Sequence, residues 1–434
     1  MDKKKSVYND QRESVDPIPY GRQNITQTDI DAVTEALKSD YLTQGPKIKE
    51  FEEAFAKYVG SKYAVAVSNG TAALHLNALA LDVKPGDKVI TTPITFAASA
   101  NCVRYCGGEV VFADIDPETY LLDINKVRDI LEKDVNKEVK GIIPVDFAGR
   151  AVDLEAFRKL ADEYGLWIIE DSCHSPGGYF TKANGEISTC GSGEFADLAI
   201  FSFHPVKHIA SGEGGMITTN DEKLYHKLLM LRTHGITKDA DSFQNTIDFA
   251  IGQPQTAHRS PLTAYPPWYM EMQMLGYNYR ITDFQSALGL SQLQRADQGI
   301  IKRQEIAARY YEAFKDIPQI KDRNYESANH QPPTANSEKP IANSQNGHAH
   351  HLYVIEAKDR LGLYNYLREQ KIFAQIHYIP CHLMPYYREQ GWQEGDMPNA
   401  EKYYKNCISL PMFPTLGEEE QNFVIETISS FYLQ

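Results

Sequence analysis

Short apolar runs alternate, along the first half of the chain, with stretches whose apolar residues recur at helical spacing. KVITTP (88–93) and LWIIED (166–171) are typical of buried strands, and DLEAFRKLADEYG (153–165) is typical of an amphipathic helix. This alternation predicts an α/β fold with a mostly parallel sheet covered by helices on both faces. The expected strands lie within 64–81, which continues through a turn into a helix, and within 88–93, 109–116, 140–149, 166–171 and 196–203.

The pattern changes after GGMITTND (214–221). Residues 221–234 and 282–315 have helical spacing, whereas 321–350 is polar and rich in Asn, Pro, Ser and Gln, which predicts a mobile loop. Strand and helix patterns resume from residue 351. We therefore divide the chain into a flexible N-terminal tail (1–17), a large domain (18–290) and a smaller C-terminal α/β domain (291–434).

Composition and charge narrow the possible partners. The 434 residues are 42% hydrophobic and carry a formal net charge of −14, so the surface as a whole would repel nucleic acid. The first residues include lysines but no following apolar segment, so we expect neither a secretory signal nor a membrane anchor, and a cytoplasmic protein. The six cysteines form no CxxC pairs; reduced, buried thiols are expected and no metal site is predicted.

Lys207 raises the first chemical question. It follows the apolar run ADLAIFSF (196–203) and precedes a segment with three glycines. A lysine there either extends to the surface or reaches into a cleft. Ligands of open α/β sheets bind at the carboxyl ends of the strands, so a lysine that reaches into a cleft at this position could contact a ligand.

Residues that follow three other expected strands could also contact a ligand in such a cleft. Ser68–Ala72 joins a strand to a helix through a small turn, which suits a phosphate or an ordinary helix cap. Asp171 follows a strongly apolar strand and could cap the next segment or pair with a buried cation. Phe96 could belong to the core or present a flat surface.

A single cofactor would use all of these residues. Pyridoxal phosphate needs an amine that forms a Schiff base in a low-dielectric site, an anion site, a carboxylate for its pyridine nitrogen and a flat side chain for its ring. The sequence offers one residue or turn for each need: Lys207, Gly70 with Thr71, Asp171 and Phe96. Asp171 would keep the pyridine nitrogen protonated, which makes the ring an electron sink.

The sequence also resembles the DegT-type nucleotide-sugar aminotransferases, which are fold-type I pyridoxal-phosphate enzymes. The likeness runs from about Ile18 to the C-terminus. PVDFAGR (144–150) and QIHYIP (375–380) are most similar to the branch that makes UDP-4-amino-4,6-dideoxy-N-acetyl-β-L-altrosamine, a pseudaminic-acid precursor. The other segments that carry the resemblance are SNGTAAL, TPITFAA, EDSCHS, FSFHPVKHIASGEGG, LRTHG and GYNYRITDFQSALGLSQL.

The resemblance implies a role for each matching residue. Lys207 would hold the cofactor covalently, Asp171 would face the pyridine nitrogen and His174 would lie near the phenolic oxygen. Phe96 would stack on the ring. The phosphate would be bound by Gly70, Thr71 and Ser202, with Asn278 from the partner subunit of a homodimer.

The resemblance also implies the substrates. L-Glutamate would donate the amino group, and a 4-keto-6-deoxy nucleotide sugar, UDP-linked and N-acetylated, would accept it for cell-surface or flagellar glycan synthesis. Arg232, Arg280 and His377 could bind the diphosphate, or could be surface charges. The insertions 239–268 and 321–350 exceed the family's usual connections, and such loops shape a sugar pocket.

Several other functions fit parts of the pattern. A 3-amino or other nucleotide-sugar aminotransferase would share every motif, and a non-catalytic regulatory relative would bind the cofactor without turnover. Sugar dehydratases of this family replace the lysine with histidine, so Lys207 argues against that reaction. SGEGG (211–215) lacks the lysine and hydroxyl that end a phosphate-binding P-loop.

Overall fold

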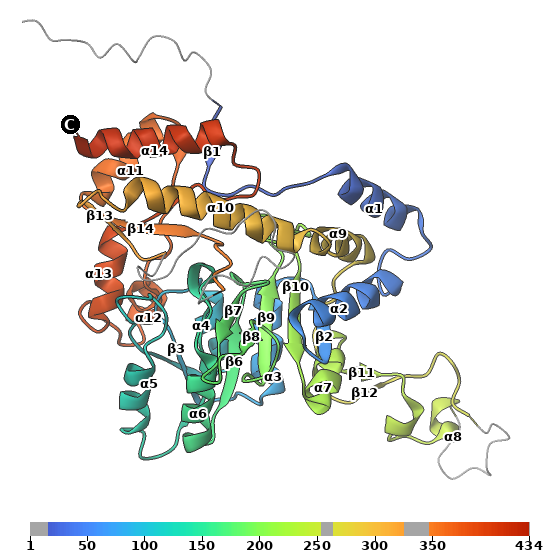
Figure 1. Cartoon of the computed structure of the whole chain (residues 1–434). Helices are drawn as coiled ribbons and strands as arrows, with labels where there is room; N and C mark the ends of the chain where they lie inside the picture. Colours follow the sequence, from blue (N-terminus) through green and yellow to red (C-terminus); the bar gives the residue numbers. More distant parts are fainter. Residues whose placement is uncertain (1–15, 253–263, 325–346, 434) are drawn as a thin grey trace, which may run out of the picture.

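The computed structural model describes residues 16–252, 264–324 and 347–433 (Figure 1). Its centre is a seven-stranded sheet in which β10 is antiparallel to both of its neighbours and the other strands run parallel to one another. The largely parallel sheet expected from the sequence is therefore confirmed. In spatial order the strands are β2 (Tyr63–Val67), β10 (Gly215–Thr219), β9 (Leu198–Ser202), β6 (Trp167–Asp171), β5 (Val139–Ile143), β3 (Lys88–Thr91) and β4 (Glu109–Phe112).

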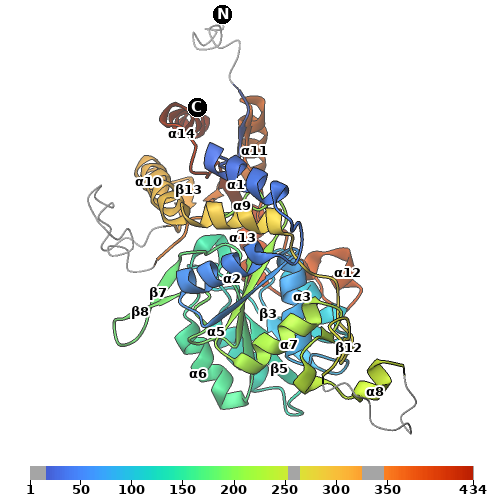
Figure 2. The ribbon, with the colours of Figure 1, turned by 90° about the vertical axis from the view of Figure 1, so that its right-hand side faces the viewer.

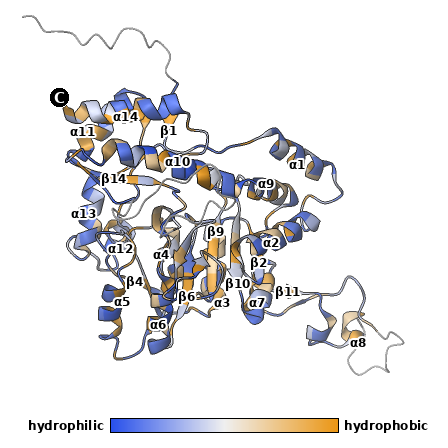
Figure 3. Ribbon diagram, in the orientation of Figure 1, coloured by the Kyte–Doolittle hydropathy of each residue, from blue (hydrophilic) through white to orange (hydrophobic). Residues whose placement is uncertain are grey.

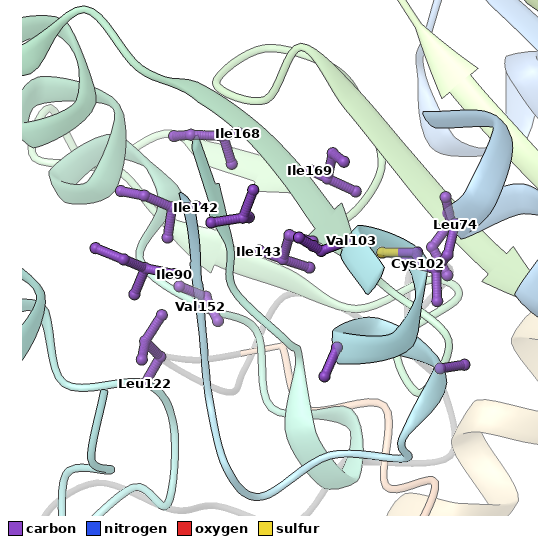
Figure 4. Packing of buried hydrophobic residues seen from close by; sticks show 14 of the residues in the cluster. Leu74, Ile90, Cys102, Val103, Leu122, Ile142, Ile143, Val152, Ile168 and Ile169 are labelled. Atoms are coloured by element: carbon purple, nitrogen blue, oxygen red, sulfur yellow. The ribbon is translucent and has the colours of Figure 1, made fainter. Parts of the chain in front are cut away.

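The central strands are apolar along their length because helices cover both faces of the sheet. Ile90, Ile142 and Ile168 are paired between neighbouring strands and are fully buried (Figure 4). Hydrophobic residues accordingly concentrate in the central strands such as β9, while helix surfaces are mixed (Figure 3).

Two groups of helices lie on opposite sides of this sheet (Figure 2). One group joins α3 (Gly70–Ala80) with α4 (Ala98–Tyr105) and α7 (Glu222–Arg232), and the other joins α5 (Ile124–Leu131) with α6 (Leu154–Tyr164). Right-handed crossovers between parallel strands require this arrangement. The loops after β2, β3, β6 and β9 consequently open at one edge of the sheet.

A second hydrophobic cluster lies beside a smaller antiparallel sheet, β13 (Ile320–Asp322), β14 (Tyr353–Ala357) and β16 (Cys407–Leu410). Ile18 belongs to this cluster, because β1 (Ile18–Pro19) pairs with β15 (Ile372–Phe373). The surrounding helices are α10 (Ala296–Phe314), α11 (Arg360–Glu369) and α14 (Glu418–Leu433). The first residues described are thus joined to the C-terminal layer.

The remaining elements connect or flank these two layers. α1 (Gln27–Lys38) and α2 (Pro46–Val59) pack on α9 (Asp283–Leu293). The others are β7 (Tyr179–Thr181), β8 (Ile187–Thr189), β11 (Ile236–Thr237), α8 (Ile247–Ala250), β12 (Glu271–Met272), α12 (Pro385–Arg388) and α13 (Pro398–Asn406). Across the described ranges, no helix has both the length and the apolar character that crossing a bilayer requires.

The predicted loop 321–350 is wrong at both ends. Lys321 and Asp322 belong to β13, and Ala349 and His350 are buried. These ends are ordered because they pair or pack with the rest of the protein, which their polar composition does not reveal. Residues 325–346 of this loop, the tail residues 1–15 and residues 253–263 of the 239–268 insertion lie outside the described residues.

Candidate active site

The loops at the carboxyl edge of the large sheet surround a cavity of about 740 Å³. Most of the residues assigned to the cofactor line it, although they come from four separate segments of the chain. They are Gly70, Thr71, Phe96, Asp171, His174, Ser202 and Lys207. The sequence predicted these residues one strand end at a time, and the sheet brings them together.

Lys207 lies in the turn after β9 and lines the cavity, so it does not simply extend to the surface. Its backbone N–H donates to the His204 carbonyl at 2.9 Å, which fixes the turn. Burial lowers the pKa of the Lys207 ammonium, because transfer from water disfavours the charged form. A neutral amine is thereby more accessible here than in an exposed lysine.

Asp171 ends β6 and is only 4% exposed. Its Oδ2 accepts a 2.6 Å hydrogen bond from Ser99 Oγ, and its Oδ1 accepts one from the Cys173 N–H at 3.2 Å. These donors stabilise a buried carboxylate and fix its orientation. Asp171 can therefore present a negative charge to a protonated ring nitrogen.

His174 is held as a neutral imidazole. Its Nδ1 accepts the Ala148 N–H at 3.2 Å, which places the ring proton on Nε2. That nitrogen lies 3.3 Å from Tyr378 Oη. Burial lowers the pKa of His174 well below its usual value, and the charge of Lys207 lowers it further. His174 is consequently a hydrogen-bond donor in the cavity and carries no charge at neutral pH.

The turn before α3 has the geometry of an anion site. Asn69 caps the helix, its Oδ1 accepting from the Ala72 N–H at 2.8 Å and its carbonyl from the Ala73 N–H at 3.1 Å. The preceding amides, those of Gly70 and Thr71, have no acceptor within the helix. A Cβ on Gly70 would lie 3.0 Å from the Ser202 Cβ and 3.3 Å from its Oγ. Glycine thus lets the Ser202 hydroxyl approach the same amides.

Phe96 does not belong to the hydrophobic core. Its side chain is 64% exposed although it lines the cavity. An aromatic ring left exposed beside a cavity can cover a flat ligand. Together with the capped turn, the buried carboxylate of Asp171 and the desolvated amine of Lys207, this surface fits pyridoxal phosphate.

The three proposed diphosphate-binding residues have different positions. His377 lines the cavity, and its Nδ1 is 2.9 Å from Ser409 Oγ. Arg232 is not brought to the cavity: its Nη1 pairs with Glu52 Oε1 at 2.5 Å and donates to the Ala66 carbonyl at 2.7 Å. Arg280 is not among the residues that line the cavity of its own chain, and neither is Asn278, which is exposed.

The cavity residues that sequence reasoning missed include two aromatic residues beside His174. His351 lies just before β14, and its ring centroid is 4.3 Å from that of His174. Tyr378, from the C-terminal layer, approaches His174 from another direction. The histidines of GHAHH (347–351) directly precede a strand and are a signal for His351, but 347–350 fall within the predicted loop 321–350. The motif QIHYIP contained Tyr378 without indicating its position.

Acid should destabilise the cofactor-free protein partly through His377. Burial, followed by the charge of Lys207, lowers the pKa of His377 to about 4 from 6.5. The unfolded chain then binds more protons as the pH falls from 6.5 toward 4, so stability present at neutral pH is lost over this range, by about 2 kcal/mol at pH 5. We expect His377→Gln to lose about 2 kcal/mol less between pH 7 and pH 5 in urea unfolding. An equal loss in both proteins would contradict this contribution.

The fold and cavity define a pyridoxal-phosphate-dependent aminotransferase, and comparison with known proteins gives its family. Residues 23–429 match the DegT/DnrJ/EryC1/StrS aminotransferase family, and the chain belongs to it. Family members are sugar aminotransferases that use pyridoxal phosphate. The resemblance, the enzyme class and the cofactor predicted from the sequence are thereby confirmed.

Individual relatives extend over nearly the whole chain. The chain is 36% identical to a spore coat polysaccharide biosynthesis protein of Bacillus subtilis, with 95% of this chain and 96% of the relative covered. It is 33% identical to a UDP-4-amino-4,6-dideoxy-N-acetyl-β-L-altrosamine transaminase of Campylobacter jejuni, with 95% and 97% covered. A solved aminotransferase of pseudaminic acid biosynthesis from Helicobacter pylori is 30% identical, with a TM-score of 0.78 and 96% and 100% covered.

Proposed function

We propose that this sugar aminotransferase transfers the amino group of L-glutamate to carbon 4 of a UDP-linked, N-acetylated 4-keto-6-deoxy sugar. Glutamate leaves as 2-oxoglutarate, and the keto sugar becomes a 4-amino sugar for cell-surface or flagellar glycan synthesis. The cavity that contains Lys207, Asp171 and the α3 turn supports the transamination. The Campylobacter and Helicobacter relatives support the choice of sugar.

Each side chain of the cavity has a different proposed role in the reaction. Pyridoxal phosphate, when bound, supplies an electron sink for the charge left when a proton leaves the substrate carbon. Lys207 Nζ, with its lowered pKa, accepts that proton and returns it. Asp171 would hold a proton on the pyridine nitrogen, and His174 would donate its Nε2–H to the phenolic oxygen. Gly70, Thr71 and Ser202 would bind the phosphate, and Phe96 would cover the ring.

A substrate panel tests this function. Purified enzyme is incubated with glutamate and a series of UDP- and dTDP-linked 4-keto and 3-keto sugars, and the amino sugar and 2-oxoglutarate are quantified. We expect the UDP-linked, N-acetylated 4-keto sugar to give the highest kcat/KM. A higher value for a dTDP-linked or 3-keto sugar would contradict the substrate assignment. A bound cofactor whose absorbance glutamate leaves unchanged would instead favour the non-catalytic regulatory relative.

The active site is proposed to be shared between two subunits. Asn278 and Arg280 flank the cavity-lining Tyr279 in sequence, but neither lines the described cavity of its own chain. Asn278 is exposed, so its side chain is accessible to the phosphate site of a partner subunit. In a two-fold dimer, Asn278 would then complete the partner's phosphate site and Arg280 would supply a cation for the diphosphate.

Mixing two damaged variants should restore activity. If Asn278 serves the partner, Lys207→Ala and Asn278→Ala place their lesions in the same site of a heterodimer, so one site carries both lesions and the other carries none. We expect activity to rise above the summed variants, toward about half that of wild type per heterodimer. Tagged pull-down confirms subunit exchange.

The matched control mixes Lys207→Ala with Asp171→Asn. These two residues line one cavity of one chain, so every site of that heterodimer carries a lesion and no gain is expected. The test requires Asn278→Ala to be impaired alone. With exchange confirmed, equal results for both mixtures would contradict the shared site.

A further inference from the structure

Two buried carboxyl groups lie behind the cavity and have no part in the chemistry proposed above. Asp146 follows β5 and is fully buried, and Glu170 in β6 is 1% exposed. Their carboxyl oxygens and the Cys190 Sγ all lie within 4.8 Å of one another. Across the described parts of the chain, neither carboxyl forms an ion pair with a cationic side chain. Two negative charges would therefore face each other in a dry interior.

Hydrogen-bond donors stabilise a charge on Asp146 better than one on Glu170. Asp146 Oδ2 accepts from the hydroxyls of Ser172 at 3.0 Å and Ser175 at 2.6 Å, and its Oδ1 accepts from the Val152 N–H at 2.9 Å. Glu170 Oε2 accepts from the Gly191 N–H at 2.9 Å, and its Oε1 has no partner in the described structure. The charge consequently belongs on Asp146.

The electrostatics agree with this distribution. Burial, and then the neighbouring Asp146, raise the pKa of Glu170 well above its usual value. Burial also raises the pKa of Asp146, but the donors from Ser175, Val152 and Ser172 lower it. Cys190 is the other titratable group in this cluster, and burial raises its thiol pKa, so it remains a neutral donor.

Asp146 is connected to two residues of the proposed cofactor site. Ser172 and Ser175, which donate to its carboxylate, flank His174 in sequence. Its backbone N–H donates to the Asp171 carbonyl at 3.1 Å. Two residues further on, the Ala148 N–H donates to His174 Nδ1 and fixes its tautomer. Movement of Asp146 would displace both cofactor-facing side chains.

We infer that Asp146 and Glu170 share a single proton, held on Glu170, and that the charged Asp146 is a positioning residue for Asp171 and His174. This role rests on the proposed contacts of Asp171 and His174 with the cofactor. The shared proton does not, because it belongs to the cofactor-free chain.

Infrared spectroscopy of the cofactor-free protein tests the shared proton. At pH 7 we expect a carbonyl band of a protonated carboxyl group that Glu170→Gln removes. Glu356→Gln is the matched control: Glu356 is also buried, but it is paired with Lys321 Nζ at 2.8 Å, so its loss should leave the band in place. Absence of the band in the wild type, or its survival in Glu170→Gln, would overturn the shared proton.

Cofactor binding tests the positioning role. Glutamine resembles a protonated Glu170, so Glu170→Gln should keep the Kd for pyridoxal phosphate within about twofold, while Asp146→Asn weakens it by about tenfold or more. Asp146→Asn should also shift the pH profile of bound-cofactor absorbance, because His174 loses its fixed position. Equal damage in the two variants, or a wild-type Kd and profile in Asp146→Asn, would overturn the role.

A milder pair of variants covers the case in which Asp146→Asn does not fold. Ser175→Ala removes the shortest bond to Asp146, whereas Ser188→Ala truncates an equally small buried serine elsewhere. Only Ser175→Ala should shift the pH profile and the ¹⁵N signals of His174; a null result in Ser175→Ala overturns the role. If these results hold but no 4-keto sugar is aminated, the substrate proposal fails and this inference stands.

Discussion

Replacing Lys207 with alanine is expected to abolish transamination, with a loss of about 10³-fold or more in kcat. Lys207 is the lysine that lines the described cavity, and its lowered pKa suits it to the two proposed roles, nucleophile for the cofactor and proton carrier at the substrate carbon. An alanine methyl group can perform neither role. Purified wild-type protein should be yellow, and borohydride should fix the cofactor to it covalently.

The measurement is mass spectrometry after borohydride reduction. The wild type should carry the cofactor on the peptide that contains Lys207, and Lys207→Ala should carry none. Lys402→Ala, which removes an exposed lysine of α13, should behave as the wild type. Covalent cofactor on Lys207→Ala would show that another lysine forms the link.

Asp171→Asn is expected to retain the cofactor and lose most turnover. The carboxylate at the end of β6 is buried and oriented by Ser99, and a neutral amide cannot hold the pyridine nitrogen protonated. Loss of a hydrogen bond to a charged group costs about 1.5–3 kcal/mol, which corresponds to a reduction in kcat of about ten- to a hundredfold. Steady-state rates and the absorbance of the bound cofactor are measured on the same preparation.

Ser99→Ala supplies the matched comparison. It removes the 2.6 Å donor to Asp171 but leaves the negative charge, so its kcat should lie between those of the wild type and Asp171→Asn. Near-normal turnover in Asp171→Asn would remove this carboxylate from the mechanism. Loss of cofactor from Asp171→Asn would mean that the residue contributes mainly to binding.

Local sequence was enough to find the residues that follow strands. Asp171 ends an apolar run, Lys207 follows another, and the turn at Gly70 joins a strand to a helix, so short-range patterns placed them at one edge of a parallel sheet. The chemistry of pyridoxal phosphate then gave each of them a use. The same reasoning could not decide whether Phe96 is buried, because an isolated aromatic residue carries no such pattern.

Other features depend on contacts between distant segments. β10 is antiparallel to both of its neighbours although, like them, it is largely buried, so its direction follows from the route of the chain. Arg232 and Glu52 are 180 residues apart, and their buried ion pair leaves the arginine outside the cavity. No local pattern indicates such a pairing.

The sequence by itself thus determined the α/β class, the positions of most central strands along the chain and the polar residues at their ends, because hydrophobic periodicity and turn chemistry act over a few residues. Only the tertiary structure decided that His351 and Tyr378 flank His174, and that Asp146 and Glu170 meet behind the cavity. Those contacts join segments from different strands and layers, and side-chain burial and packing fix them only when the whole chain has folded.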